Sequence, residues 1–430
     1  MADSARLPVT LSGWLAYIEA LHPKTIEMGL TRVSTVAKRL NLTPSFPIIT
    51  VAGTNGKGST CAMLSQIYIR AGYKVGCYTS PHLIRYNERV KINGLEISDE
   101  SLCEAFSAVE KARGDVALTY FEMGTLAAMW HFLQQKIEVA VLEVGLGGRL
   151  DAVNVFEPDC CIVTSVDLDH MDYLGDTREL IGLEKAGIFR AEKPAICGDA
   201  QPPSSLRNHA EQIGADLQCI GEVFYIVNTD AAWRYQDADG YMDLPLPRLQ
   251  GDFQLNNAAC ALRAAKQMNA KLPVTQVHIE DALNFTDLAG RFQQLQSHPE
   301  VILDVAHNPH AADSLARNLA THPCQGRTVA VFAMLSDKDI DGVIRSLLPY
   351  ISVWYVAGID APRGESAENL QRRLSALGAL SNGYSSVDEA FEAAYQAVGK
   401  NDRIIVFGSF YTVAAAMARS QANARPTSRR

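Results

Sequence analysis

The sequence predicts an α/β protein of two domains, each built on a sheet of mainly parallel strands covered by helices. The chain has 430 residues, more than one ordinary hydrophobic core accommodates. Short apolar runs rich in β-branched residues alternate with helical patterns, the order typical of a parallel sheet with helices on both faces. A polar segment at residues 289–299 separates two such series. We therefore expect domains over residues 1–290 and 300–430.

The N-terminal series supplies strands that are apolar throughout and are therefore expected to be buried. They are expected at residues 46–53, 73–80, 139–148, 160–170 and 193–199. A helix follows the first strand from about residue 59 to 71. Residues 221–250 are aromatic and turn-rich and predict a small antiparallel excursion, after which residues 254–268 return to helix.

The C-terminal series begins near Val301 and continues the alternation. Its strands are expected at residues 301–307, 327–334, 352–358 and 402–410. The last residues, "RPTSRR", form a basic tail that we expect to be frayed, as chain ends commonly are. Because ligands of such sheets bind beyond the carboxyl ends of the strands, functional residues should gather there.

The composition is that of a globular enzyme, with 47% hydrophobic and 20% charged residues. The formal net charge is −9 and no Lys/Arg cluster precedes the tail, which argues against a nucleic-acid partner. No apolar run reaches the length of a membrane span, and the N-terminus lacks a secretory signal pattern. The nine cysteines include no C-x-x-C pair, which favours buried thiols in a reducing compartment. We expect a cytoplasmic protein with no membrane partner.

The stretch "VAGTNGKGST" at residues 51–60 follows an apolar strand and predicts a phosphate-binding loop. Glycines between a strand and a helix let backbone N–H groups face an anion, and the helix N-terminus adds its positive dipole end. Lys57 can neutralise the β- and γ-phosphates, and Ser59 or Thr60 can approach a metal. Gly58 separates Lys57 from these hydroxyls, unlike the usual G-x-x-x-x-G-K-[ST]. The alternative is an ordinary strand–helix turn.

Two further strand ends carry side chains suited to a metal. Glu143 lies on an apolar strand, where a carboxylate is costly unless it is paired or bound to metal; a buried salt bridge is the alternative. His170 ends another such strand, with Asp167, Asp169 and Asp172 beside it. This acidic loop favours nearby Mg²⁺, which prefers oxygen ligands, although His170 is equally compatible with a satisfied core histidine.

Two other features are ambiguous on the residues alone. Thr177 can cap the helix that contains Lys185, and the residues themselves favour an exposed helical lysine. In the second domain, "ILDVAHNPHAA" places Asp304 and His307 at a strand end. An acid there often binds a ribose hydroxyl, while Asn308 before a proline fits a helix N-cap.

Taken together, these stretches resemble the folylpolyglutamate synthase/dihydrofolate synthase family, relatives of the Mur peptide ligases. The matching pieces span nearly the whole chain in order: "KTIEMGLTRV" (24–33), "GTNGKGST" (53–60), "SPHL" (80–83), "TYFEMGTLAA" (119–128), "LEVGLGGRLDAVN" (142–154), "TSVDLDHMDYLG" (164–175), "EKAGI" (184–188), "GRF" (290–292), "DVAHNPHAA" (304–312), "MLSDKD" (334–339) and "GSFYTV" (408–413). The resemblance implies an N-terminal P-loop ATPase domain with a mostly parallel sheet and a smaller, Rossmann-like C-terminal α/β domain. The extra Gly58 is this family's own spelling of the loop.

The resemblance also implies an ATP-dependent amide ligase that activates a carboxylate as an acyl phosphate and joins it to L-glutamate. The implied ATP contacts are Thr54, Asn55, Gly56, Lys57, Gly58, Ser59, Asn257, Arg291, Asp304 and His307. Two Mg²⁺ sites are implied, one held by Ser80 and Glu143, the other by His170, Glu143 and Lys185. Lys185 would first react with CO₂ to form a carbamate, since an ammonium cannot ligate a metal. The implied catalytic residues are Lys57, Glu143, His170 and Lys185.

In family members that make dihydrofolate, the pterin acid lies near two of these segments. The implied contacts are Glu27, Met28, Gly29, Thr119, Tyr120, Phe121, Glu122, Asp151 and Asn154. Phe121 is a plausible stacking partner for the flat ring, with core packing as the alternative. We expect both activities: glutamate added to dihydropteroate, and further glutamates added to reduced folates, by a monomer.

Three alternatives stay open at this point. The first is a monofunctional folylpolyglutamate synthase. The second is a Mur-type ligase acting on a cell-wall nucleotide, which the loop spelling and the lack of an obvious extra UDP-binding domain disfavour. The third is a non-catalytic nucleotide switch, which would not require Glu143, His170 and Lys185.

Overall fold

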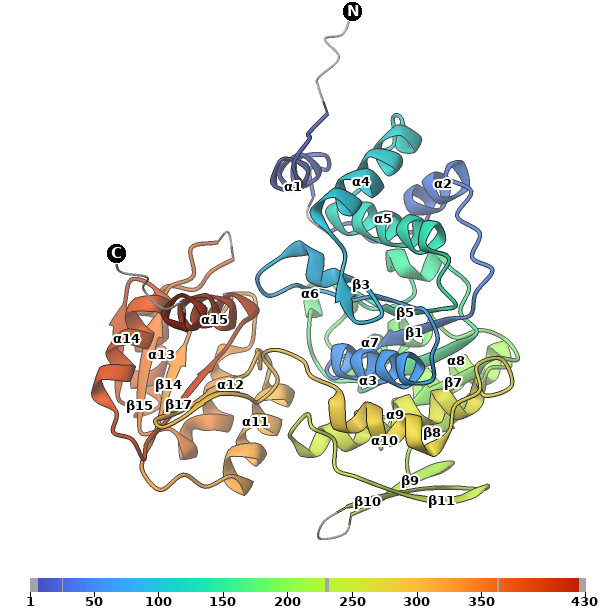
Figure 1. The fold of residues 1–430 in the computed structure, drawn as a ribbon. Helices are drawn as coiled ribbons and strands as arrows, with labels where there is room; N and C mark the ends of the chain where they lie inside the picture. The colour runs from blue at the N-terminus through green and yellow to red at the C-terminus, as the bar shows by residue number, and fades with distance from the viewer. Residues whose placement is uncertain (1–6, 25, 229–231, 362, 425–430) are drawn as a thin grey trace, which may run out of the picture. The chain divides into compact units, whose positions relative to one another are not determined.

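The computed structural model describes residues 7–24, 26–228, 232–361 and 363–424 (Figure 1). The basic tail expected to be frayed, residues 425–430, lies outside them. The chain divides into two compact units. The first comprises Met1–Arg248 with Leu255–Thr286, and the second comprises Leu249–Gln254 with Asp287–Arg430.

The described residues of the first unit form an eight-stranded sheet in the order β4-β3-β2-β5-β1-β6-β7-β8. The strands are β1 (Ile48–Ala52), β2 (Val75–Tyr78), β3 (Val90–Ile92), β4 (Leu95–Glu96), β5 (Val139–Glu143), β6 (Cys160–Val163), β7 (Pro194–Cys197) and β8 (Asp216–Cys219). The six strands β2, β5, β1, β6, β7 and β8 pair in parallel, whereas β3 pairs antiparallel with both β2 and the short edge strand β4. Every residue of β1 and β5 is buried, as expected for central strands covered on both faces.

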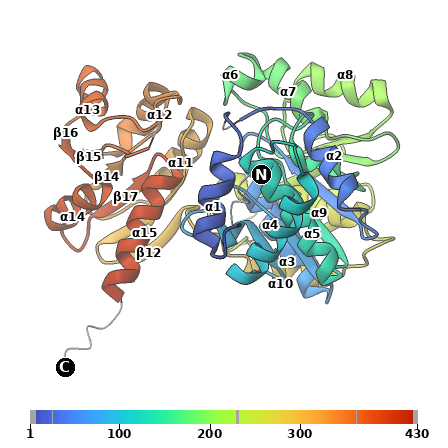
Figure 2. The ribbon, with the colours of Figure 1, turned by 90° about the horizontal axis from the view of Figure 1, so that it is seen from above.

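Helices cover both faces of this sheet (Figures 1 and 2). They are α1 (Leu11–Ala20), α2 (Thr31–Arg39), α3 (Lys57–Arg70), α4 (Asp99–Arg113), α5 (Tyr120–Gln135), α6 (Met171–Leu174), α7 (Arg178–Ala186), α8 (Ser204–Ile213), α9 (Asp252–Gln267) and α10 (Gln276–Phe285), with 3-10 turns η1 (Tyr86–Arg89) and η2 (Ala152–Val155). α1, α2, α4, α5, α7 and α8 join one buried cluster with alternate strand residues. α3 packs on β1, β2 and β5, and α10 packs on α3.

The expected antiparallel excursion is present as a small sheet in the order β11-β10-β9. Its strands are β9 (Phe224–Asn228), β10 (Trp233–Asp237) and β11 (Gly240–Leu244). Buried Asp237 accepts hydrogen bonds from Arg263 Nη1 at 2.9 Å and Lys266 Nζ at 2.6 Å. Both cations lie on α9, so this ion cluster fastens the small sheet to that helix.

The second unit contains a sheet in the order β12-β13-β17-β14-β15-β16, parallel apart from β12. Its elements are β12 (Gln293–Ser297), β13 (Glu300–Leu303), α11 (Pro309–Thr321), β14 (Thr328–Phe332), α12 (Ile340–Leu347), η3 (Leu348–Tyr350), β15 (Val353–Ala357), α13 (Ala367–Ala376), β16 (Ser381–Tyr384), α14 (Val387–Ala397), β17 (Arg403–Phe407) and α15 (Phe410–Ala424). Packed rings of Phe332, Trp354 and Phe407 form its centre, with centroids 4.9–5.8 Å apart.

Two details differ from the sequence expectations. The polar segment expected to be the domain junction contains β12, an edge strand in which Gln294 and Ser297 are exposed and the other residues are partly buried. The strand expected at residues 160–170 ends at Val163. His170 therefore does not end a strand; it lies beyond a loop as the N-cap of α6, with φ of +52°.

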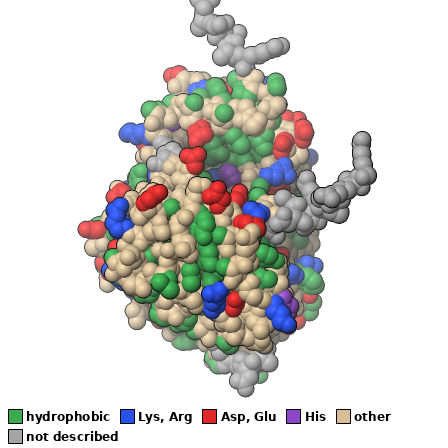
Figure 3. All heavy atoms as spheres, turned by 90° about the vertical axis from the view of Figure 1, so that its left-hand side faces the viewer, with side chains coloured by type: hydrophobic (Ala, Val, Ile, Leu, Met, Phe, Trp, Pro, Cys, Tyr) green, Lys and Arg blue, Asp and Glu red, His purple; other side chains and the backbone are tan. Residues whose placement is uncertain are grey.

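None of the helices within the described ranges combines the length and apolar character needed to cross a membrane. On the face in Figure 3, Lys and Arg lie among Asp and Glu.

Candidate active site

Two glycines shape the loop between β1 and α3. Gly53 and Gly56 have φ angles of +149° and +85°, which L side chains rarely adopt. A Cβ atom added at Gly53 would lie 1.9 Å from Thr164 Oγ1, and one added at Gly56 would lie 2.3 Å from Asn257 Oδ1. Glycine is therefore needed at both positions for its conformational freedom and for space. Asn257, from α9, lies directly against the loop.

The segment after β6 holds the same loop by hydrogen bonds. Thr54 N donates to Ser165 O at 2.8 Å, and the Thr54 hydroxyl donates to Asp167 O at 3.0 Å. Asn55 N donates to Ser165 Oγ at 3.1 Å, and Asn55 O accepts from Thr164 Oγ1 at 2.5 Å. This bracing fixes the loop ahead of α3, whose first N–H groups have no partner within the helix and can face an anion.

Lys57 and the hydroxyls after it complete an anion-binding arrangement. Lys57 Nζ donates to the carbonyl oxygens of Gly53 at 2.9 Å and Thr54 at 3.2 Å. Ser59 is 1% exposed, and its hydroxyl, like that of Thr60, has no hydrogen-bond partner within the described residues. Buried hydroxyls are normally paired. A glycine loop, a lysine and two such hydroxyls at one helix N-terminus therefore fit a polyphosphate and its metal.

Ser80 and Glu143 meet because β2 and β5 are neighbours in the sheet. The register pairs Tyr78 with Leu142, so the residues just beyond lie side by side. Ser80 N donates to Glu143 Oε2 at 3.1 Å. Glu143 is only 4% exposed, and a buried carboxylate is costly unless it is paired or binds a metal. Its oxygens, with the Ser80 hydroxyl nearby, are suitable ligands for Mg²⁺.

Lys185 is buried, whereas the residues alone favoured an exposed helical lysine. It lies on α7, capped as expected by Thr177, whose hydroxyl accepts from Leu180 N at 3.3 Å. Lys185 is 3% exposed and makes no hydrogen bond or ion pair within the part of the chain that the structure describes. Burial, with a further contribution from Lys57, lowers its pKa to about 7, against the opposing effect of Asp169.

His170 follows Asp169 and precedes α6, with its Nε2 4.0 Å from Asp169 Oδ2. Asp169 Oδ1 accepts from His170 N at 2.9 Å, and Asp167 Oδ1 accepts from Leu168 N at 2.7 Å. Within the described residues, no three His, Cys, Asp or Glu side chains form a metal-binding group. The acidic loop is therefore not a metal cluster by itself. Of the metal ligands that the sequence predicts, only Glu143 and His170 are residues of these four types. The other two are Ser80 and the carbamate of Lys185.

The segments expected to bind the pterin acid are joined by Arg32. Its Nε lies 3.2 Å from both carboxylate oxygens of Glu122, and its Nη1 donates to Glu27 Oε1 at 3.1 Å. Its Nη2 also donates to Glu27 O at 2.7 Å. Buried Glu122 accepts from Thr119 N at 2.8 Å, completing a capping box at the start of α5. Arg32 thus fixes the loop that contains Glu27 to the start of α5.

A third segment, residues 145–151, adjoins these two. The ring of Phe121 is half-buried, 5.9 Å from that of Tyr78. A Cβ added at Gly145 would lie 2.6 Å from Phe121 Cζ. Gly29 N donates to Leu150 O at 3.2 Å. The backbone of 145–151 therefore borders both Phe121 and the loop that contains Met28 and Gly29. Tyr120 precedes Phe121 in the first turn of α5.

Asp151 and Asn154 support this third segment. Asp151 accepts from Leu146 N at 2.8 Å and Val153 N at 3.0 Å, and burial raises its pKa to about 7. Asn154 Nδ2 donates to the carbonyl oxygens of Arg149 and Gly187, at 3.0 and 3.1 Å. Its Oδ1 accepts from Arg190 Nη2 at 3.0 Å. Asn154 is thereby bound to protein groups.

In the second unit, Arg291 and His307 flank the ring of Phe410. The Arg291 guanidinium carbon is 5.3 Å from the ring centroid, and the His307 ring is 6.2 Å away. Asp304 accepts from Phe292 N at 2.9 Å and Ala306 N at 2.8 Å. Burial raises the pKa of Asp304, against the opposing effect of Arg291. Both Asp304 oxygens therefore already accept backbone bonds.

Asn308 caps α11 as its sequence position suggested. Its Oδ1 accepts from Ala311 N at 2.9 Å, and Pro309 occupies the first helical position, where its missing N–H costs nothing. This cap fixes the start of α11, directly after the loop that contains Asp304 and His307.

Residues 51–265 match the Mur ligase middle domain, and residues 290–410 match the Mur ligase, glutamate ligase domain. The dihydrofolate synthase/folylpolyglutamate synthase of Escherichia coli (strain K12) is 47% identical over 411 residues, covering 95% of this chain and 94% of that protein. The chain belongs to the dihydrofolate synthase/folylpolyglutamate synthase family of Mur ligases. The Bacillus subtilis (strain 168) protein of the same name is 32% identical over 84% of this chain and 88% of its own.

Solved structures of this ligase family have the same fold. E. coli FolC in complex with DHPP and ADP superimposes with a TM-score of 0.93 at 46% identity, over 97% of this chain and 99% of that chain. A Yersinia pestis c092 bifunctional folylpolyglutamate synthase/dihydrofolate synthase complexed with AMPPNP and Mn ion gives 0.91 at 43% identity, over 97% and 100%. The family and the fold class predicted from the sequence are confirmed.

Four supporting residues of this family member were missed by sequence reasoning. Thr164 and Ser165 brace the phosphate loop, and a pair of hydroxylated residues directly after an apolar strand was the signal that could have found them. Arg32 lies within a recognised motif, but nothing in the sequence indicates that it reaches Glu122. Phe410 also lies within a matched motif, and only the structure shows that it contacts Arg291.

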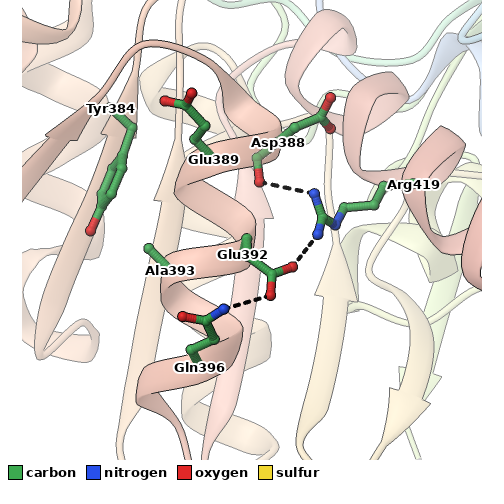
Figure 4. A pocket seen from close by; sticks show the side chains of 7 residues that line it. All are labelled: Tyr384, Asp388, Glu389, Glu392, Ala393, Gln396 and Arg419. Atoms are coloured by element: carbon green, nitrogen blue, oxygen red, sulfur yellow. Dashed lines mark hydrogen bonds and ion pairs between the residues drawn. The ribbon is translucent and has the colours of Figure 1, made fainter.

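A pocket in the second unit involves none of the residues above (Figure 4). Its lining residues are Tyr384, Asp388, Glu389, Glu392, Ala393, Gln396 and Arg419. Arg419, the one cation among the described lining residues, pairs with Glu392, and its Nη1 lies 3.4 Å from Asp388 O. Because acidic side chains dominate the lining, this pocket is unsuited to nucleotide phosphates.

Proposed function

We propose that this chain is an ATP-dependent ligase that joins L-glutamate to dihydropteroate, making dihydrofolate, and to reduced folates, making folylpolyglutamates. The observation that carries the proposal is the phosphate loop, with Lys57 and the unpaired hydroxyl of Ser59, within a chain related over nearly its whole length to named ligases of both activities. E. coli FolC in complex with DHPP and ADP supports the same assignment.

The chemistry has two steps. A carboxylate oxygen of the acid substrate attacks the γ-phosphorus of ATP, giving an acyl phosphate and ADP. The amine of L-glutamate then attacks the acyl carbon, loses a proton and displaces phosphate. Phosphoryl transfer depends mainly on positioning and cations, which are what Lys57 and the loop N–H groups of Thr54–Ser59 provide. Asn257, Arg291, Asp304 and His307 are the proposed further contacts to the nucleotide.

Bound Mg²⁺ would neutralise charge on the phosphates and help align them. Glu143 and Ser80 would hold one ion. Glu143, His170 and the carbamate of Lys185 would hold a second. The Yersinia pestis relative complexed with AMPPNP and Mn ion supports a divalent metal beside the nucleotide.

The carbamate is proposed from the chemistry of Lys185. With its pKa lowered to about 7 by burial, much of the Lys185 amine is neutral and nucleophilic at neutral pH. Nζ would attack the carbon of CO₂, forming a nitrogen–carbon bond and releasing one proton to solvent. The product is a carboxylate, which converts a buried group with no acceptor into a metal ligand.

The pterin acid is proposed to lie against Phe121. Stacking on an aromatic face suits a flat ring, and the segments around Glu27–Gly29, Thr119–Glu122 and Asp151 adjoin that side chain. Arg32 and Asn154 would support these segments. The cytoplasmic location and monomeric state stay predictions from the sequence.

The test is phosphate release from ATP, measured with glutamate and each acid in turn. The proposal requires release that depends on glutamate with dihydropteroate and also with tetrahydrofolate. Activity with tetrahydrofolate alone would indicate a monofunctional folylpolyglutamate synthase. Activity only with a cell-wall nucleotide would indicate the Mur alternative. Slow hydrolysis indifferent to every acid would indicate a nucleotide switch and refute the ligase.

A further inference from the structure

Arg89 is a half-buried arginine that has no carboxylate partner among the described residues. Other arginines with similarly shielded side chains pair with Asp or Glu: Arg32, Arg113, Arg190, Arg263 and Arg403. Arg85, which lies four residues earlier and is more exposed, pairs with Asp99 at 3.0 Å. A guanidinium keeps its charge at all ordinary pH values. A shielded one without a counter-ion therefore suggests that the ligand brings the negative charge.

The Arg89 guanidinium is held in place without being neutralised. Its Nε donates to His82 Nδ1 at 2.8 Å, so this histidine nitrogen accepts with its lone pair. The rings of Tyr86 and Tyr120 lie 5.2 and 5.6 Å from the guanidinium carbon. The hydrogen bond occupies the Nε edge of the Arg89 guanidinium, and the two aromatic rings are cation–π partners of the same group. The Tyr78 hydroxyl also lies beside the guanidinium, but no carboxylate within the described chain accepts from its two Nη groups, which form the fork that binds carboxylates in bidentate fashion.

Arg89 stands between the two halves of the proposed acid-binding site. Its carbonyl oxygen accepts from Thr79 N at 2.9 Å, and the residue after Thr79, Ser80, donates to Glu143. On the other side, Tyr120 directly precedes Phe121. A substrate whose ring lies on Phe121 and whose reacting carboxylate lies at Ser80 and Glu143 would pass beside Arg89.

The chemistry of the substrates supplies a matching anion. A reduced folate ends in a glutamyl group with two carboxylates, of which one reacts and the other does not. Dihydropteroate has only the carboxylate that reacts. The incoming L-glutamate also has carboxylates that do not react. We propose that Arg89, positioned by His82, binds the unreacted carboxylate of a glutamyl group, either that of the folate terminus or that of the incoming glutamate. This inference rests on the proposed function.

The two sources are separated by comparing the two reactions. KM and kcat would be measured for wild type, Arg89→Gln and Arg89→Lys with dihydropteroate and with tetrahydrofolate. If the folate terminus is bound, Arg89→Gln raises KM for tetrahydrofolate roughly tenfold or more, as expected for losing a bidentate charged pair, and leaves KM for dihydropteroate unchanged. If the incoming amino acid is bound, KM for glutamate rises in both reactions. Arg89→Lys keeps the charge without the fork and should restore only part of the affinity.

A change in the substrate tests the same contact in the unmodified protein. Tetrahydrofolate whose unreacted carboxylate is replaced by a carboxamide should bind wild type more weakly, and Arg89→Gln should not distinguish it from the parent compound. L-Glutamate with the same replacement of an unreacted carboxylate by a carboxamide tests whether Arg89 binds the incoming amino acid. Arg85→Gln, which removes an exposed arginine that already has a partner, is the control and should keep all KM values.

Two results with the variants would overturn the inference. One is an Arg89→Gln protein with every KM unchanged, and the other is an equal fall in kcat for both acids with no change in KM, which indicates a structural role. Wild type that accepts both carboxamide analogues as well as their parents would overturn it without any variant. Failure of the proposed function is a distinct outcome, because wild type itself would then show no glutamate-dependent phosphate release.

Discussion

At the scale of single residues, buried groups without partners indicate where ligands belong. Lys185 has no acceptor within the described residues, and Ser59 has an unpaired hydroxyl. An unpaired buried polar group costs roughly 1–3 kcal/mol, so such groups are rarely retained without use. Neither burial could be predicted from the sequence. The packing of α7 decides whether Lys185 lies on the buried or the exposed side of the helix. The residues next to Lys185 in the sequence are compatible with either side.

Ligase activity should require Lys185, and arginine at this position should not replace it. Lys185→Ala should lower ligase turnover on the order of 10²-fold or more, comparable to losing one electrostatic stabiliser. Lys185→Arg should be equally poor, because a guanidinium stays protonated and forms no stable carbamate. Acetate should partly restore Lys185→Ala by replacing the missing carboxylate. Turnover would be measured with and without bicarbonate, beside a mass spectrum of the protein. An active Lys185→Arg would refute the carbamate.

Replacing Arg32 should weaken binding of the acid substrate and leave binding of the nucleotide unchanged. Arg32→Gln removes the ion pairs to Glu27 and Glu122 and leaves the buried Glu122 carboxylate without its charged partner. Breaking such a pair costs on the order of 3 kcal/mol, enough to loosen the contact between the Glu27 loop and the start of α5 beside Phe121. KM for dihydropteroate should rise about tenfold or more, with KM for ATP unchanged. Arg39→Gln, on the same helix, is the control. Equal changes in both KM values would contradict a local role.

At the scale of elements, the strands could be predicted well because apolar β-branched runs have few alternatives in a covered sheet. Their carboxyl ends were harder to locate. "CCIVTSVDLDH" reads as one strand, yet pairing with β7 stops at Val163, and the residues after it turn to bind the phosphate loop. Such a boundary depends on Thr164 and Ser165 meeting Thr54 and Asn55, a tertiary contact that periodicity does not contain.

Gly56→Ala should damage nucleotide binding far more than a matched glycine change. Gly56 and Gly72 lie before and after α3 with similar φ angles, +85° and +90°. A Cβ at Gly72 meets nothing within 4 Å, whereas one at Gly56 meets Asn257 at 2.3 Å. Both variants should lose roughly 1 kcal/mol of stability through backbone strain. Only Gly56→Ala should also raise KM for ATP. The measurements are urea unfolding and ATP kinetics, and unchanged ATP kinetics would show that the loop tolerates the displacement of Asn257.

At the scale of the whole molecule, two α/β series in the sequence correspond to two compact units. The division is less linear than the sequence suggested, because Leu249–Gln254 belongs with the second unit while Leu255–Thr286 returns to the first. Each unit carries part of the expected ATP contacts: Asn257 in the first, and Arg291, Asp304 and His307 in the second. Sequence order alone does not reveal that α9 begins in one unit and continues into the other.

The stability of the whole chain should depend on pH through Lys185. Burial and Lys57 lower its pKa to about 7 when folded, against about 10.4 in an unfolded chain. Between these values the unfolded chain binds one more proton, so this group makes the free energy of unfolding rise by about 1.4 kcal/mol per pH unit. Lys185→Met removes that dependence. The variant should therefore be more stable than wild type at pH 7, by a margin that shrinks toward zero near pH 10. Urea unfolding of both proteins in CO₂-free buffer measures the margin, and a margin constant from pH 7 to 10 would show that Lys185 titrates normally in the folded protein.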